Sequence, residues 1–108
     1  WSSDVCSSDL FENFFDIIVL TQTIEHVRNI GGVKECLLHL LKTGGYAIVD
    51  CPWGPESPDY HAEPPSFGDY WRISDEGLIL IFCGNLNEFS PILKQRTSAN
   101  SAVLLLKQ

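Results

Sequence analysis

The sequence predicts an α/β fold in which a parallel strand pair is followed by a carboxyl-terminal antiparallel hairpin, with flanking helices. Phe15 to Leu20 and Tyr46 to Asp50 are nearly continuous apolar runs, as in strands buried on both faces. A helical pattern lies between them, and a strand–helix–strand unit pairs its strands in parallel through a right-handed crossover. These runs and their order predict the fold class.

The helices are predicted from periodicity and end signals. Thr21 to His26 should turn from the first strand into a short helix. Apolar residues between Val33 and Leu41 recur at helical spacing, and Gly44 stands where a glycine ends a helix. Ser74 is a good N-cap, so Leu78 to Phe82 is predicted as a helix rather than a strand.

The carboxyl-terminal hairpin is predicted from two apolar segments around a polar turn. Phe89 to Gln95 and Ala102 to Leu106 are the strands, joined by Thr97 to Asn100. Pro91 indicates an edge strand or a bulge. Cys51 to Ile73 holds five of the six prolines and is predicted as a long loop, which in a small domain is usually functional or disordered.

Composition and the length of the apolar runs argue against a nucleic-acid partner and against a membrane-spanning helix. The 108 residues include 14 Asp and Glu against 7 Lys and Arg, a net charge of -7. This acidity disfavours nucleic acid, because phosphate binding needs clustered basic residues. The longest uncharged apolar runs are far shorter than the roughly 20 residues of a membrane-spanning helix. We therefore expect neither a nucleic-acid partner nor a membrane span.

Residues 1–10 are predicted to be a non-native or artefactual leader. The chain contains no Met, and this segment repeats Ser-Ser-Asp without any structural pattern. The four cysteines form no CxxC pair, so a zinc or redox motif is not indicated. They are interpreted as small buried hydrophobes of a reduced protein, which predicts a cytoplasmic location.

Three strings occur in order: FDIIVLTQTIEHV at 15–27, LLKTGGY at 40–46 and DYWRISDEGL at 69–78. Together they resemble class I S-adenosylmethionine-dependent methyltransferases of the type 11 and type 12 kind, over residues 11–108. The resemblance implies the carboxyl-terminal half of a Rossmann-like methyltransferase sheet, with equivalents of strands four to seven and the last antiparallel beside the fifth. It also implies S-adenosylmethionine as cofactor and a small-molecule, glycan-linked or lipid-linked acceptor.

The family's glycine-rich loop, and the acid that holds the ribose hydroxyls, have no counterpart in these 108 residues. The resemblance therefore implies methyl transfer as part of a longer chain, with these residues alone inactive. A non-catalytic α/β interaction module or pseudoenzyme fragment is the alternative. A third interpretation is that the chain is half of another nucleotide-binding enzyme, such as a dehydrogenase. The DYWRISDEGL string and the hairpin argue against it. The strand from Asp16 to Leu20 would lie at a sheet edge and favour self-association.

Cofactor-binding residues are implied where the first strand ends. Ligands of open α/β sheets lie beyond the carboxyl ends of the strands, which places Leu20, Thr21 and Gln22 at the mouth of the site. In the family, this segment touches the methionine part of the cofactor. A polar strand-to-helix turn would use the same residue types, so both interpretations stand.

His26 is the candidate catalytic residue, because imidazole titrates near working pH and can act as a general base. In some relatives a Glu-x-x-Glu-His string binds a divalent metal. Here Gln22 occupies its first position, and we predict no metal. The alternative is that His26 packs locally while Glu25 pairs with Arg28 or solvent.

The candidate substrate-binding residues are His61, Tyr70 and Arg72, in the long loop. Such loops form the acceptor side of the site in the family. An aromatic ring can shape a pocket, and Arg72 could pair with phosphate or carboxylate. Alternatively, Tyr70 and its neighbour Trp71 anchor the loop on the sheet, and Arg72 offsets a nearby aspartate. Cys51 is discounted as a nucleophile, since the spacing implies no activating base.

Overall fold

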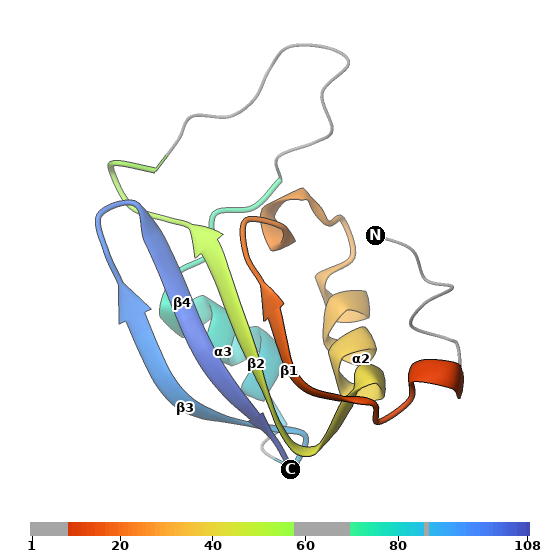
Figure 1. Cartoon of the computed structure of the whole chain (residues 1–108). Coiled ribbons are helices and arrows are strands. Elements are labelled where there is room, and N and C mark those ends of the chain that lie inside the picture. The colour runs from red at the N-terminus through yellow and green to blue at the C-terminus, as the bar shows by residue number, and fades with distance from the viewer. Residues whose placement is uncertain (1–8, 58–69, 86) are drawn as a thin grey trace.

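The computed structural model describes residues 9–57, 70–85 and 87–108, which form one four-stranded sheet with its two α-helices on one face (Figure 1). In chain order the elements are η1 (Asp9–Phe11), β1 (Phe15–Leu20), η2 (Ile24–His26), α2 (Ile30–Leu40), β2 (Leu41–Pro52), α3 (Asp75–Cys83), β3 (Phe89–Arg96) and β4 (Asn100–Lys107), where η denotes a short 3₁₀ helix. Most of the predicted leader, residues 1–8, lies outside the described residues.

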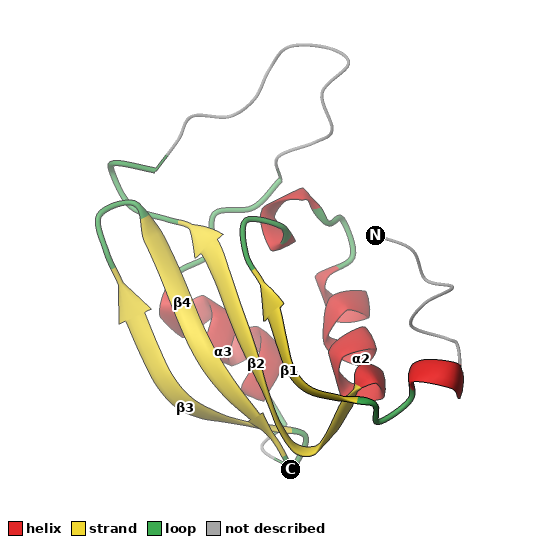
Figure 2. Ribbon diagram, viewed as in Figure 1, coloured by secondary structure: helices red, strands yellow, loops and turns green. Residues whose placement is uncertain are grey.

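The sheet has the strand order β1-β2-β4-β3 (Figure 2). β1 and β2 are parallel, with Ile17 opposite Tyr46 and Leu20 opposite Val49. β4, the last strand in the chain, lies between β2 and β3 and is antiparallel to both. The predicted fold class is confirmed, including the antiparallel last strand beside the second strand of the parallel pair. The register of β3 shifts between Pro91 and Leu93, so the proline lies at an irregularity of an edge strand.

Side-chain caps start both α-helices. The amide of Gly32 donates to Asn29 Oδ1 at 3.1 Å where α2 begins. The amide of Gly77 donates to Ser74 Oγ at 3.0 Å where α3 begins, which confirms the predicted N-cap. Each cap provides an acceptor for an amide that has no partner within its helix.

The predicted end of the first long helix is wrong. α2 ends at Leu40, and Leu41 already has extended backbone angles and belongs to β2. Gly44 has φ +84 within this strand and is not a helix terminator. Leu40 and Leu41 both fit the apolar period of a helix. Both side chains are buried in the structure, although Leu41 begins a strand, so burial alone could not mark the helix end.

The hydrophobic core lies between the sheet and the two α-helices. Val33 and Leu37 of α2 and Leu78 and Phe82 of α3 are in the same buried cluster as Val49 of β2. Buried residues alternate with more exposed ones over residues 46–51 of β2 and residues 100–106 of β4. The buried residues of these alternating stretches are Ala47, Val49, Cys51, Ser101, Val103 and Leu105, and Leu41 at the start of β2 is buried in the same cluster.

The other face of the sheet is apolar and is not covered by a helix among the described residues. Ile17 and Val19 of β1 are 58% and 57% exposed, and Leu93 of β3 is 66% exposed. Tyr46 and Ile48 of β2 lie between them in register. We call this surface the open sheet face. The prediction of strands buried on both faces is therefore wrong for the described residues, because α2 and α3 pack on the same side.

The cysteines differ from one another. Cys51 and Cys83 are free and buried, as expected for small hydrophobes. Cys36 is disulfide-bonded, so its interpretation as a free thiol is wrong. Spacing does not reveal which segments tertiary folding brings together. Disulfides are rare in reducing compartments. The cytoplasmic location was inferred from reduced cysteines, and it stays a prediction.

None of the helices among the described residues combines the length and the apolar character that crossing a bilayer requires.

Candidate functional site

The carboxyl ends of β1 and β2 meet at one edge of the sheet, and the segment after β1 lies there (Figure 1). Leu20, the last residue of β1, is buried, whereas Thr21 and Gln22 are exposed. Thr23 Oγ1 donates to the carbonyl of Thr21 at 2.8 Å, just before η2 begins. The structure thus places all three predicted cofactor-binding residues at this edge, with two of them accessible.

Gln22 connects the ends of three strands. Its backbone amide donates to Asp50 Oδ1 at 2.8 Å, and its side-chain Nε2 lies 3.3 Å from the same oxygen. Nε2 also lies 3.2 Å from Oδ1 of Asn100, at the start of β4. Sequence reasoning missed Asp50 and Asn100 as parts of this site. The position of Asp50 at the end of a predicted strand was the one available signal.

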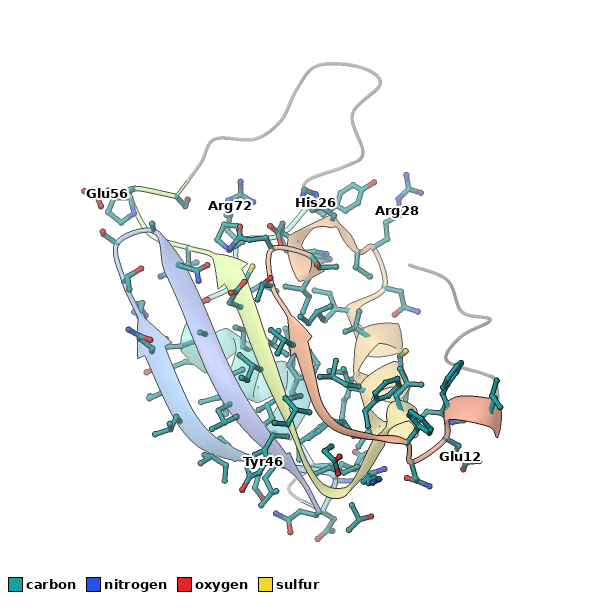
Figure 3. The ribbon with its side chains drawn as sticks, viewed as in Figure 1. Glu12, His26, Arg28, Tyr46, Glu56 and Arg72 are labelled. Atoms are coloured by element: carbon teal, nitrogen blue, oxygen red, sulfur yellow. The ribbon has the colours of Figure 1, made fainter. Side chains whose placement is uncertain are left out.

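η2 presents a carboxylate and an imidazole side by side. Glu25 is only 3% exposed, while His26 is half-buried and lies at the carboxyl edge (Figure 3). Nε2 of His26 is 3.8 Å from Oε2 of Glu25. This separation is within the range of an ion pair but is too long for a hydrogen bond.

The segment from Tyr70 to Arg72 packs onto η2 and the residues after it. The amides of Tyr70 and Trp71 donate to the carbonyl of Glu25 at 2.7 and 3.3 Å. Trp71 Nε1 donates to the carbonyl of Val27 at 2.7 Å. The end of the long loop is therefore fixed beside His26, so residues predicted for the cofactor side and the acceptor side share one edge.

Arg28 is a further residue of this edge that sequence reasoning considered only as a partner of Glu25. Its Nε donates to the hydroxyl of Tyr70 at 3.0 Å, and its guanidinium lies 5.5 Å from the centroid of that ring. The hydrogen bond to Tyr70 raises the pKa of Arg28 further above its usual value, so the group stays cationic. Both side chains remain accessible to solvent.

Arg72 is half-buried and points to the same edge (Figure 3). Its Nη1 donates to the carbonyl of Trp71 at 3.0 Å. Asp75, one of the aspartates considered as its partner, instead contacts Arg96 of β3, with Nη2 and Oδ1 2.6 Å apart. His61 lies outside the described residues.

Cys51 lies beneath this edge and has no access to solvent. Burial is the largest effect on its thiol and raises its pKa to about 11. At neutral pH the group is therefore a protonated thiol, not the thiolate that acts as a nucleophile. The described residues also contain no group of three or more His, Cys, Asp or Glu side chains that could hold a metal ion.

Comparisons with known proteins identify the fold. No protein-family model matches the sequence, and no curated protein matches it. Solved structures do match. The 1,6-didemethyltoxoflavin N1-methyltransferase of Burkholderia thailandensis, solved with S-adenosylhomocysteine, superposes with a TM-score of 0.75 at 16% identity, over 96% of this chain and 48% of that one.

Two further structures show the same likeness. An S-adenosylmethionine-dependent methyltransferase of Methanosarcina mazei has a TM-score of 0.67 at 11% identity, over 95% of this chain and 64% of that one. The [4+2]-cyclase SpnF has a TM-score of 0.69 at 13% identity, over 96% and 54%. The chain spans about half to two thirds of the structures it matches. It has the partial fold of class I methyltransferases, which also occurs in a protein named for a different reaction.

Proposed function

We propose that these residues form part of an S-adenosylmethionine-dependent methyltransferase that acts on a small-molecule, glycan-linked or lipid-linked acceptor. The observation that carries the proposal is the sheet order β1-β2-β4-β3 with its antiparallel last strand, together with the polar edge at Thr21, His26 and Tyr70. In open α/β folds ligands bind at this edge. Likeness to methyltransferases of known structure supports the same reaction.

The residues at the edge fit one end of the proposed donor. The hydroxyl of the exposed Thr21 can donate to the carboxylate of a methionine moiety, and the backbone carbonyl of Gln22, whose amide is engaged by Asp50, can accept from its ammonium group. The chain contains no G-x-G-x-G string to approach the rest of a nucleoside. Leu20, Thr21 and Gln22 would therefore line only one side of the bound donor.

S-adenosylmethionine, when bound, supplies a methyl group already activated by a sulfonium. The role we propose for the chain's own residues is to position an acceptor and to remove its proton. His26 would take that proton at its imidazole, whose Nε2 lies 3.8 Å from the Glu25 carboxylate. Tyr70 would offer its ring to a sugar or another flat group, while Arg72, like Arg28, would pair with an anionic substituent. His61 remains a proposed acceptor contact.

The coding sequence upstream of Phe11 tests this function. We expect it to encode a strand, a glycine-rich loop and an Asp or Glu about 20 residues further on. The longer polypeptide should bind S-adenosylhomocysteine in calorimetry, and Thr21→Ala should weaken binding about tenfold by removing one hydrogen bond. Thr43→Ala, at the opposite end of β2, is the matched control and should leave the Kd unchanged. A reading frame that starts at Phe11, or a longer polypeptide without binding, would contradict the proposal.

The open sheet face favours a second candidate, a non-catalytic interaction module that self-associates. β1 is an edge strand, and its exposed Ile17 and Val19 continue the apolar surface of β2. Contiguous apolar surface of this kind usually marks an interaction site. We propose that copies of the chain associate through β1 and this adjoining surface.

Self-association predicts a concentration-dependent mass in sedimentation or light scattering. We expect dimers or larger species at about 100 μM, and Val19→Lys should raise the dissociation constant at least about tenfold by placing a charge in the contact. Leu80→Lys is the control, because Leu80 is 76% exposed on α3, away from the open sheet face. A wild-type chain that stays monomeric at high concentration, or a Val19→Lys variant that associates normally, would exclude this surface.

A further inference from the structure

Gln22 adopts a backbone conformation that its residue type disfavours. Its φ is +49, in the left-handed region, where among the described residues only Asn13 and two glycines also lie. Asparagine and glycine enter this region readily, whereas glutamine does so rarely. A residue held there needs tertiary contacts that outweigh the local preference, and such residues cluster at functional sites.

Those contacts come from two other strands. Asp50 Oδ1, at the end of β2, accepts the backbone amide of Gln22 at 2.8 Å and is also 3.3 Å from its Nε2. Asn100 contributes its Oδ1, 3.2 Å from that Nε2. Asn100 is itself fixed by the hairpin turn, since its amide donates to Thr97 Oγ1 at 3.0 Å and its carbonyl accepts the amide of Thr97 at 2.8 Å. The turn after β1 is thus attached to a rigid part of the sheet.

We propose that Asp50 is a positioning residue, whose carboxylate holds Gln22 in the left-handed conformation and so sets the direction in which Thr21 faces the carboxyl edge. A hydrogen bond from a backbone amide to a carboxylate is charge-assisted, and is stronger than one to a neutral acceptor. Gln22 then serves the site through its backbone carbonyl, because its amide is engaged by Asp50 and its side-chain nitrogen by Asp50 and Asn100. The relevance of this geometry to ligand binding rests on the proposed function, whereas the geometry itself does not.

Amide NMR of the 108-residue chain tests the proposal without any ligand. Asp50→Ala should change the HN–Hα coupling of Gln22, which depends on φ, and speed hydrogen exchange at its amide at least about tenfold. Asp50→Asn, which keeps a neutral acceptor, should have a smaller effect. The matched control is Asp16→Ala, which removes an exposed carboxylate near the start of β1 that forms an ion pair with Lys42.

Glycine at position 22 separates positioning from general stability. Because glycine adopts positive φ without a side-chain clash, Gln22→Gly in the Asp50→Ala background should restore the Thr21 and Thr23 amide shifts toward wild type. If Asp50 had only a general structural role, glycine at position 22 would not restore the amide shifts of these two residues. Unchanged coupling and exchange at Gln22 in Asp50→Ala, or no rescue by glycine, would overturn the proposal. Absence of methyl transfer by the longer polypeptide would instead contradict the proposed function and leave these readouts as they are.

Discussion

S-adenosylhomocysteine is expected to bind the 108-residue chain only weakly, with a Kd of about 1 mM or higher. Tight sites enclose most of a ligand's surface, and here Leu20, Thr21 and Gln22 would line one side only. Two carboxylates that the structure describes near this edge, Asp50 and Glu25, are poorly placed to hold a ribose. Asp50 already accepts two hydrogen bonds from Gln22, and Glu25 is buried in η2.

Isothermal titration calorimetry at high protein concentration measures this affinity, and Thr21→Ala provides the comparison. A micromolar Kd that Thr21→Ala weakens would show that the edge alone encloses the ligand. A micromolar Kd that Thr21→Ala leaves unchanged would place binding elsewhere on the chain. Either result would contradict the expectation that these residues contribute only part of the donor site.

Phe82→Ala is expected to lower the free energy of unfolding by about 3–5 kcal/mol. Phe82 of α3 has no exposed surface and packs edge-to-face on Phe89 of β3, with ring centroids 6.5 Å apart. Removing the ring deletes this contact and leaves a cavity beneath β3 and β4, where α3 joins the hairpin to the core. A loss of this size is a large fraction of the stability of a small domain.

Urea denaturation followed by circular dichroism measures this effect. Leu80→Ala is the matched control in the same helix, because Leu80 is exposed and its truncation should change stability by no more than about 0.5 kcal/mol. Equal effects of the two substitutions would contradict the assignment of Phe82 to the core. They would indicate that α3 does not pack on the sheet as the structure describes.

Local signals predicted the elements whose ends carry a side-chain cap or a turn. Ser74 marked the start of α3, and the polar turn before Asn100 separated β3 from β4. Gly44 misled the same reasoning, because a glycine at positive φ serves an irregular strand as well as it serves a helix end. The apolar runs located β1 and β2, but they could not show that both helices pack on the same face.

The sequence allowed prediction of those site residues that lie in local motifs, but not of the contacts between distant segments. Thr21, His26 and Tyr70 lie within recognisable strings, and the structure brings them to one edge of the sheet. Asp50 and Asn100 were missed because they contact Gln22 across 28 and 78 positions of sequence. Arg28 was considered only with its near neighbour Glu25, whereas its partner Tyr70 is 42 positions away.

By itself, the sequence determined the strands, the Ser74 cap and their order, because these depend on neighbouring residues and on the period of apolar side chains. Only the tertiary structure decided the left-handed turn at Gln22, the docking of Trp71 on η2 and the exposure of the open sheet face. The physical reason is that these features arise from contacts between segments that are distant in the chain, and local preference carries no information about them.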